Sequence, residues 1–107
     1  MITRPGETRW IHGSAVNAPV TVTIPGENRR RRSLSKILFS YSATPTGGRV
    51  TVTIEGEIPL SHAITAAGPG PLNVNIAGVV NRPMVVTLDA GGAGVTGDLS
   101  VEYFDPQ

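Results

Sequence analysis

Few residues of this sequence belong to the types that catalyse reactions or hold metal ions. It contains two histidines, His12 and His62, and no cysteine. A Ser-His-Asp triad around His62 could use only scattered residues, namely Ser61 or Ser100 and Asp89 or Asp98. No nucleophile-elbow motif surrounds either serine, and two imidazoles without a thiolate do not supply a zinc site. We therefore expect no catalytic residue, no metal site, no cofactor and no enzymatic activity, and we place His62 in the core or at a sheet edge.

The only charge cluster is a run of four arginines, Arg29, Arg30, Arg31 and Arg32. It falls between two predicted strands, so a solvated turn is the simplest interpretation. A protein partner is the main alternative, because guanidinium groups make bidentate contacts with carboxylates. Nucleic-acid binding is disfavoured, since no aromatic residue interleaves the arginines and the net charge of the chain is only +1. We expect no nucleic-acid partner.

A glycine-rich stretch between Asp89 and Asp98 has the composition of a ligand-binding loop without the pattern of one. It lacks the Gly-Lys-Ser/Thr of a phosphate-binding loop, and its two carboxylates stand at opposite ends, unlike the spaced ligands of a calcium loop. We interpret it as a long hairpin connection whose glycines adopt positive φ. Asn73 and Asn75 occupy polar positions of a short strand, where they could contact a sugar or a partner's backbone, although solvation alone also explains them.

The strongest structural signal is the peptide Val-Thr-Val-Thr-Ile-x-Gly-Glu, which occurs at residues 20–27 and again at 50–57. In each copy the aliphatic residues alternate with threonine, so a strand would present one apolar face and one hydroxyl face. β-branched residues suit such a half-buried pleated surface. Because nothing else in the two segments matches, convergence on one strand-and-turn solution is favoured over true duplication.

Similar alternations, separated by turns containing Gly and Pro, predict further strands and no helix. Expected strands cover residues 9–12 (with Trp10 facing inward), 20–24, 35–42, 49–55, 58–64, 72–76, 84–89 and 98–104. The strands at 35–42 and 49–55 are expected to form a hairpin. The predicted fold class is all-β, an antiparallel β-sandwich, Ig-like or jelly-roll-like, of about 7–8 short strands.

The chain of 107 residues has the size of one domain. We assign residues 1–18 to an N-terminal arm and first edge strand, and residues 19–107 to the sandwich. No stretch has the length and apolarity of a membrane span or of a signal peptide, so we expect no membrane association and no export signal. The absence of cysteine fits assembly in a reducing cytoplasm.

Three phrases in the last two thirds of the chain carry a family resemblance. They are Phe-Ser-Tyr-Ser-Ala-x-Pro-Thr-Gly-Gly-Arg-Val-Thr-Val from residue 39, Ala-Ile-Thr-Ala-Ala-Gly-Pro-Gly from residue 63, and Val-Thr-Leu-x-Ala-Gly-Gly-Ala-Gly-Val-Thr-Gly-Asp-Leu-Ser-Val from residue 86. In this order they resemble small structural proteins encoded by tailed bacteriophages. The phrases consist mostly of strand and turn residues, and the N-terminal third with its arginines lies outside the resemblance.

The resemblance implies a non-enzymatic virion structural protein, assembled in the host cytoplasm. It implies a capsid decoration (cement) or minor capsid protein that binds and stabilises the shell of the major capsid protein. The alternative is a tail- or fibre-associated module that binds a host surface glycan or another tail protein. A homo-oligomer is expected, and a trimer would match the local threefold positions of a capsid lattice. The candidate partner-binding residues are the four arginines Arg29, Arg30, Arg31 and Arg32, and, around the N-terminal arm, Thr3, Arg4, Arg9 and Trp10.

Overall fold

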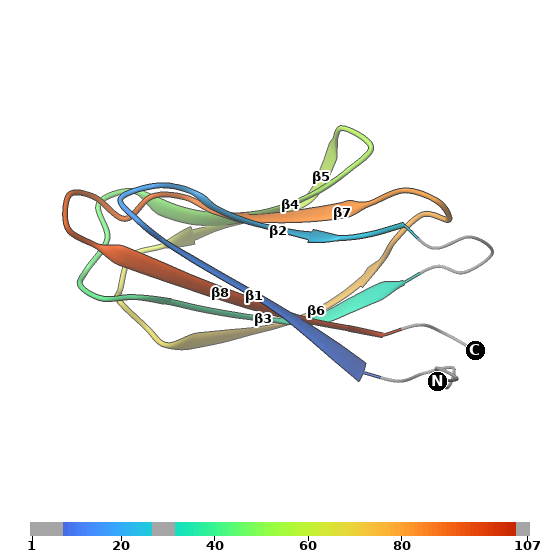
Figure 1. Cartoon of the computed structure of the whole chain (residues 1–107), viewed down its shortest axis with the longest axis horizontal. Coiled ribbons are helices and arrows are strands. Elements are labelled where there is room, and N and C mark those ends of the chain that lie inside the picture. The colour runs from blue at the N-terminus through green and yellow to red at the C-terminus, as the bar shows by residue number, and fades with distance from the viewer. Residues whose placement is uncertain (1–7, 27–31, 105–107) are drawn as a thin grey trace.

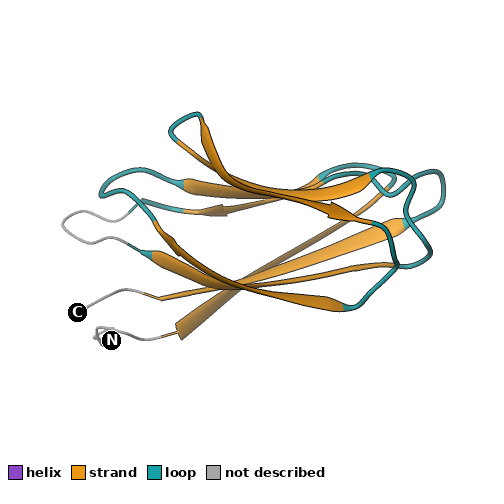
Figure 2. Cartoon of the chain, turned by 180° about the vertical axis from the view of Figure 1, so that it is seen from behind, coloured by secondary structure: helices purple, strands orange, loops and turns teal. Residues whose placement is uncertain are grey.

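The computed structural model describes residues 8–26 and 32–104, and within them it contains eight strands and no helix. The strands are β1 (Thr8–Val16), β2 (Val20–Ile24), β3 (Ser33–Tyr41), β4 (Gly48–Ile54), β5 (Glu57–Ile64), β6 (Gly70–Ala77), β7 (Met84–Leu88) and β8 (Thr96–Phe104). Figure 2 shows the loops gathered mainly at the two ends of the strands. Each strand prediction from the sequence overlaps one of these elements.

The strands form two four-stranded antiparallel sheets that pack face to face (Figure 1). Sheet A has the order β1-β8-β3-β6, and sheet B has the order β2-β7-β4-β5. The predicted antiparallel β-sandwich is confirmed. In the described chain only β4 and β5 are paired neighbours in sequence, and this winding of the chain between two sheets is that of a jelly roll.

Two predicted hairpins are wrong for the same reason. The strands expected to pair at 35–42 and 49–55 became β3 and β4, which lie in different sheets. The glycine-rich stretch likewise leads from β7 in sheet B to β8 in sheet A. Both connections cross between the sheets. In sheet A, β3 already has β8 and β6 as its two neighbours, and in sheet B, β7 already has β2 and β4, so neither strand has a free edge for the strand that follows it. A turn signal in the sequence marks where a strand ends and does not identify its partner.

The two copies of the duplicated peptide became β2 and β4, which flank β7 on its two sides. They are aligned in register, since Val22 and Val52 both lie opposite Val86, and Thr21 and Thr51 both lie opposite Thr87. The valines and isoleucines of both copies are buried between the sheets, whereas the threonines face outward. Sheet B therefore carries a core-facing aliphatic surface and an outer hydroxyl surface, as the alternation predicts.

The single variable position in the duplicated peptide determines which way the chain continues after each copy. In the second copy Glu55 and Gly56 have φ of 50° and 79°, the left-handed pair that closes a two-residue hairpin from β4 to β5. The first copy has Pro25 at this place, and the proline ring holds φ near −65°, so that turn is forbidden. After Pro25 the chain leads to β3 in the other sheet instead.

The core lies between the sheets and comes from the inward positions of the central strands together with β2. Its largest fully buried side chains are Ile24, Leu34, Ile37, Met84, Leu88, Leu99, Val50, Val52, Val86 and Val101. The edge strands contribute less, and the inward residues of β6, Leu72, Val74 and Ile76, are only partly buried. One long side of the sandwich, between the edge strands β5 and β6, is therefore less well covered.

The predicted inward orientation of Trp10 is wrong. Trp10 lies opposite the outward residue Glu102, whereas Ile11 lies opposite the fully buried Val101. As a result the indole is 48% exposed. Successive side chains alternate between faces, so the inward orientation of the partly buried Ile11 places Trp10 on the outside.

Tyr41, at the end of β3, ties sheet A to the connection between β7 and β8. Its ring is buried, and its hydroxyl donates a hydrogen bond to the backbone carbonyl of Asp89 over 2.7 Å. A Cβ on Gly91 would lie 2.6 Å from Tyr41 Cδ1, so this glycine leaves space for the ring. Positive φ, predicted for the glycines of this loop, is found at Gly92 and Gly94.

Candidate functional site

The structure describes three of the eight predicted partner-binding residues, Arg9, Trp10 and Arg32. The other five lie outside the described residues and are Thr3, Arg4, Arg29, Arg30 and Arg31. No group of three or more His, Asp or Glu side chains that could hold a metal ion occurs in the described segments. In those same segments no helix is long and apolar enough to cross a membrane.

Arg9 and Arg32 come together at one end of the sandwich although 22 residues separate them in the sequence. Arg9 is paired with Tyr103 across β1 and β8, and the Arg32 guanidinium carbon lies 5.3 Å from the centre of the Tyr103 ring. Arg32 Nη1 also donates a hydrogen bond to the Pro25 carbonyl over 2.9 Å. We call the surface formed by Arg9, Arg32 and Tyr103 the basic end. Figure 1 shows that β1 and β3 begin at this end and that β2 and β8 finish there.

Trp10 belongs to a different surface, the outer face of sheet A, which we call the A face. Strand register aligns its outward residues in rows that cross the sheet. The first row is Trp10, Glu102, Lys36 and Asn73, the second is His12, Ser100, Leu38 and Pro71, and the third is Ser14, Asp98 and Ser40. Asn73 and Asn75 are exposed, as predicted for the polar positions of β6.

Several polar side chains of the A face are held by one another. His12 Nδ1 and Ser100 Oγ are hydrogen-bonded at 2.9 Å, and His12 Nε2 lies 4.0 Å from Asp98 Oδ1. Ser35 donates a hydrogen bond to Glu102 Oε1 over 2.8 Å. The face thus presents two carboxylates and an imidazole, of which Glu102 and His12 are held by hydrogen bonds.

The structure therefore gathers a serine, a histidine and an aspartate, but the histidine is His12. His62, around which a triad could be assembled on paper, lies on β5 in the other sheet, where its ring is 6.5 Å from that of Phe39. Ser100 sits in β8, which is hydrogen-bonded to strands on both sides, so its backbone amides are used by the sheet. Those amides are not available as an oxyanion hole, which acyl transfer by a serine requires.

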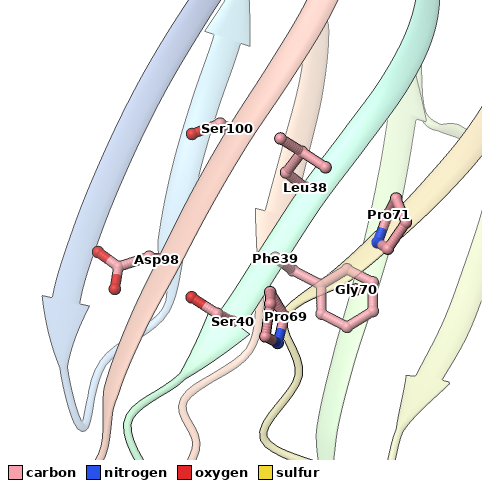
Figure 3. A pocket seen from close by; sticks show the side chains of 8 residues that line it. All are labelled: Leu38, Phe39, Ser40, Pro69, Gly70, Pro71, Asp98 and Ser100. Carbon is pink, nitrogen blue, oxygen red and sulfur yellow. The ribbon is translucent and has the colours of Figure 1, made fainter.

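An open hollow of about 320 Å³ adjoins the second and third rows of the A face. Leu38, Pro69 and Pro71 supply its apolar lining, and Ser40, Asp98 and Ser100 supply its polar lining. Figure 3 shows these residues on the neighbouring strands β8, β3 and β6, except for Pro69, which directly precedes β6, with Leu38 beside Ser100 and Pro69 beside Ser40. This combination has no signal in the sequence, because strand register and not sequence proximity brings its members together.

Comparisons with known proteins show the fold and no family. No protein-family model matches the chain, and no curated protein matches it. Among solved structures, the nucleoplasmin-like N-terminal domain of Drosophila FKBP39 has a TM-score of 0.55 at 7% identity, covering 100% of this chain and 96% of that one. The GH26-CBM35 β-(1,4)-mannanase of Podospora anserina has a TM-score of 0.56 at 10% identity. The mosquito-larvicidal Cry4Aa toxin of Bacillus thuringiensis has a TM-score of 0.53 at 11% identity.

The last two similarities concern only part of a longer protein. This chain is covered to 97% and 94%, but it matches 28% of the mannanase chain and 21% of the toxin chain. At identities this low the similarity extends to the arrangement of strands and not to the residues of any site. The comparisons therefore place this chain among β-sandwich domains.

Proposed function

We propose that this protein is a non-enzymatic structural component of a bacteriophage virion that binds the capsid shell through its basic end. The proposal rests on the resemblance of the last two thirds of the chain to small phage structural proteins. The structural observation that supports it is that Arg9 is paired with Tyr103 across β1 and β8, while the Arg32 guanidinium lies over the same Tyr103 ring. Two segments singled out separately in the sequence, the N-terminal region and the arginine run, meet the folded body at one place.

A basic end of this kind suits attachment to an acidic protein surface. The segments 1–7 and 27–31, which hold the remaining predicted residues, are joined to the described chain at Thr8, Gly26 and Arg32, next to this end. Arginine can pair with carboxylates in a bidentate manner, and complementary charge raises the rate and specificity of association. The sandwich is already folded before it binds, so little conformational entropy of the sandwich is lost on association. The major capsid protein is the proposed partner, and a homo-oligomer such as a trimer is the proposed assembly.

The test is a titration of shells assembled without this protein. Reversing the charge of Arg29, Arg30, Arg31 and Arg32 to glutamate should raise the concentration needed to saturate the shells by at least about tenfold, corresponding to the loss of about 1.4 kcal/mol. Circular dichroism and thermal unfolding establish that the variant is folded. A second variant reverses only residues 29–31 and retains Arg32 with its contacts to Tyr103 and Pro25.

The matched control is Arg49→Glu. Arg49 stands at the start of β4, at the opposite end of the sandwich, where its Nη1 donates a hydrogen bond to Ser61 Oγ over 2.7 Å (Figure 1). Its reversal changes charge without touching the basic end, so saturation should be unaltered. Equal saturation by all folded variants would show that the arginines are only solvated and would overturn the proposal.

A further inference from the structure

We infer that the A face is a binding site for a neutral carbohydrate chain, centred on Trp10 and the neighbouring hollow. This goes beyond the proposed capsid attachment, which uses the basic end. The inference concerns the residues of the three rows defined above, all of which belong to the strands of one sheet. They are fixed in relation to one another by the backbone hydrogen bonds between β1, β8, β3 and β6.

The apolar parts of the A face offer surfaces on which a sugar ring can lie. Trp10 is 48% exposed and Leu38 is 37% exposed, and both project from the same face. Pro71 lies beside Leu38 in the second row. A pyranose or furanose ring carries C–H groups on its faces, so it packs against an indole or a proline ring while its hydroxyls stay in contact with water or polar side chains. Trp suits such a boundary because its body is apolar and its N–H is polar.

The polar parts of the A face match the hydroxyls at the edge of a sugar. Asp98 and Glu102 can each accept hydrogen bonds, and Ser40, Ser100 and Asn73 can accept or donate them. These groups alternate with the apolar surfaces in the three rows. Adjacent strands are about 4.8 Å apart, so four strands span about 14 Å, enough for more than one sugar unit.

The charge of the face selects against anionic ligands. Its outward rows hold one cation, Lys36, against the two carboxylates Asp98 and Glu102. A phosphate or sulfate group placed in the hollow would be next to the Asp98 carboxylate and would be repelled. A neutral polyhydroxyl chain is not repelled and can donate hydrogen bonds to both carboxylates.

Two polar side chains of the A face are held by hydrogen bonds before a ligand arrives. Glu102 accepts a hydrogen bond from Ser35, and His12 is hydrogen-bonded to Ser100. Residues already held in place lose less conformational entropy on binding, which favours affinity. Glu102 and Asp98 also stand on β8, which is paired on both sides.

Trp10 makes the inference directly testable because it is the only tryptophan of the chain. Its intrinsic fluorescence therefore reports on the A face alone. The folded full chain is titrated with short oligosaccharides of mannose, xylose, glucose and galactose units, and with sulfated forms of the same sugars. We expect at least one neutral oligosaccharide to change the Trp10 emission saturably, and the sulfated form of that sugar to bind more weakly.

Variants then locate the site by isothermal titration calorimetry with the oligosaccharide that binds. Trp10→Ala and Asp98→Asn should each weaken binding by about tenfold or more, equivalent to about 1.4 kcal/mol. The matched controls are Ile58→Ala, which truncates an apolar residue that is 58% exposed on β5, and Glu57→Gln, which removes a carboxylate from that strand. Both controls lie on sheet B and should bind as the unaltered protein does.

Three results would overturn the inference. They are the absence of a saturable response to all neutral oligosaccharides, equal binding by Trp10→Ala and the unaltered protein, and tighter binding of sulfated than of neutral sugars. If Trp10→Ala instead abolishes attachment to capsid shells and no sugar binds, the A face is a protein interface and the inference is wrong.

Discussion

Replacing Tyr41 with phenylalanine removes one buried hydroxyl and leaves the aromatic ring in place. That hydroxyl donates a hydrogen bond to the Asp89 carbonyl over 2.7 Å, and the Tyr41 side chain is 5% exposed. The hydrogen bond joins the end of β3 to the start of the connection between β7 and β8. Tyr41→Phe therefore tests how strongly this contact between the two sheets stabilises the domain.

The expected cost near neutral pH follows from ordinary hydrogen-bond energetics. A neutral intramolecular hydrogen bond contributes about 1 kcal/mol net, and somewhat more if the remaining acceptor is left without a partner. For a domain of this size about 1 kcal/mol corresponds to a decrease in the melting temperature of roughly 4 °C. The ring itself should remain packed, because the space left by Gly48 and Gly91 is shaped around it.

The same variant should alter the response of stability to alkaline pH. Burial raises the pKa of the Tyr41 hydroxyl above its ordinary value of 10.0, the Asp89 carboxylate raises it further, and a backbone hydrogen bond at Arg49 lowers it in part. In the unfolded chain the hydroxyl ionises near pH 10, while the folded chain still holds its proton. Stability from this group is therefore complete below pH 10 and is lost as the pH rises towards and through the folded pKa, at up to about 1.4 kcal/mol per pH unit.

Phenylalanine cannot ionise, so the difference between the two proteins should shrink with rising pH. The assay is urea unfolding of both proteins at about pH 8 and at about pH 11, where the shared titration of other groups cancels in the comparison. We expect the unaltered protein to be more stable than Tyr41→Phe at the lower pH and to have a smaller advantage at the higher one. An equal difference at both values would refute the reasoning, because it would mean that Tyr41 ionises as readily in the folded protein as in the unfolded chain.

Five further substitutions, at positions 51, 52, 55 and 91, test the fold by urea unfolding. Val52→Thr should lower the free energy of unfolding by about 1–3 kcal/mol, because it buries a hydroxyl without a partner, whereas Thr51→Val should change it by less than about 0.5 kcal/mol. Comparable losses for the two variants would mean that the faces of β4 are misassigned. Glu55→Asn should be more stable than Glu55→Gln by about 1 kcal/mol, because both lack the 2.8 Å ion pair with Arg82 and only asparagine readily adopts positive φ; equal stabilities would contradict the left-handed turn. Gly91→Ala should cost about 1–3 kcal/mol because its Cβ would press on the Tyr41 ring, and an unchanged midpoint would show that the ring lies elsewhere.

The strands could be predicted from the sequence because alternation is a local property. The two copies of the duplicated peptide give complete apolar faces, and their valines and isoleucines are buried as expected. The orientation of Trp10 could not be predicted in the same way. Hydrophobicity favours burying the indole. Which residues of β1 face inward is set instead by the pairing of Ile11 with the fully buried Val101, and Val101 belongs to a strand near the other end of the chain.

Strand partners were beyond the reach of local signals. The connections after β3 and after β7 have the glycines and prolines of turns, yet they cross between sheets. Only the contrast between Pro25 and Glu55 carries a local cue, since proline excludes the positive φ that the tight hairpin at Glu55 needs. That contrast is visible in the sequence, but its meaning depends on knowing that both copies are strands of the same sheet.

The candidate sites show the same division. The arginine run is evident in the sequence, but the relation of Arg32 to Arg9 is not, because it depends on Tyr103, which is paired with Arg9 and whose ring lies 5.3 Å from the Arg32 guanidinium carbon. The A face has no sequence motif at all. Trp10, Leu38 and Asp98 come from three strands and are placed on one face of the sheet by register, so a search for residues that are close in sequence could not find them.

The two proposals assign capsid attachment and carbohydrate binding to different surfaces, so one set of variants can test each proposal separately. Capsid attachment is assigned to an end of the sandwich, where the Arg32 guanidinium lies over Tyr103, and carbohydrate binding is assigned to the outer face of one sheet. Charge reversal at residues 29–31 should weaken shell binding and leave the fluorescence response of Trp10 to a sugar intact, whereas Trp10→Ala should have the opposite pattern. If both variants lost both activities while remaining folded, the two surfaces would act as one interface, and the division between an attachment end and a ligand face would have to be given up.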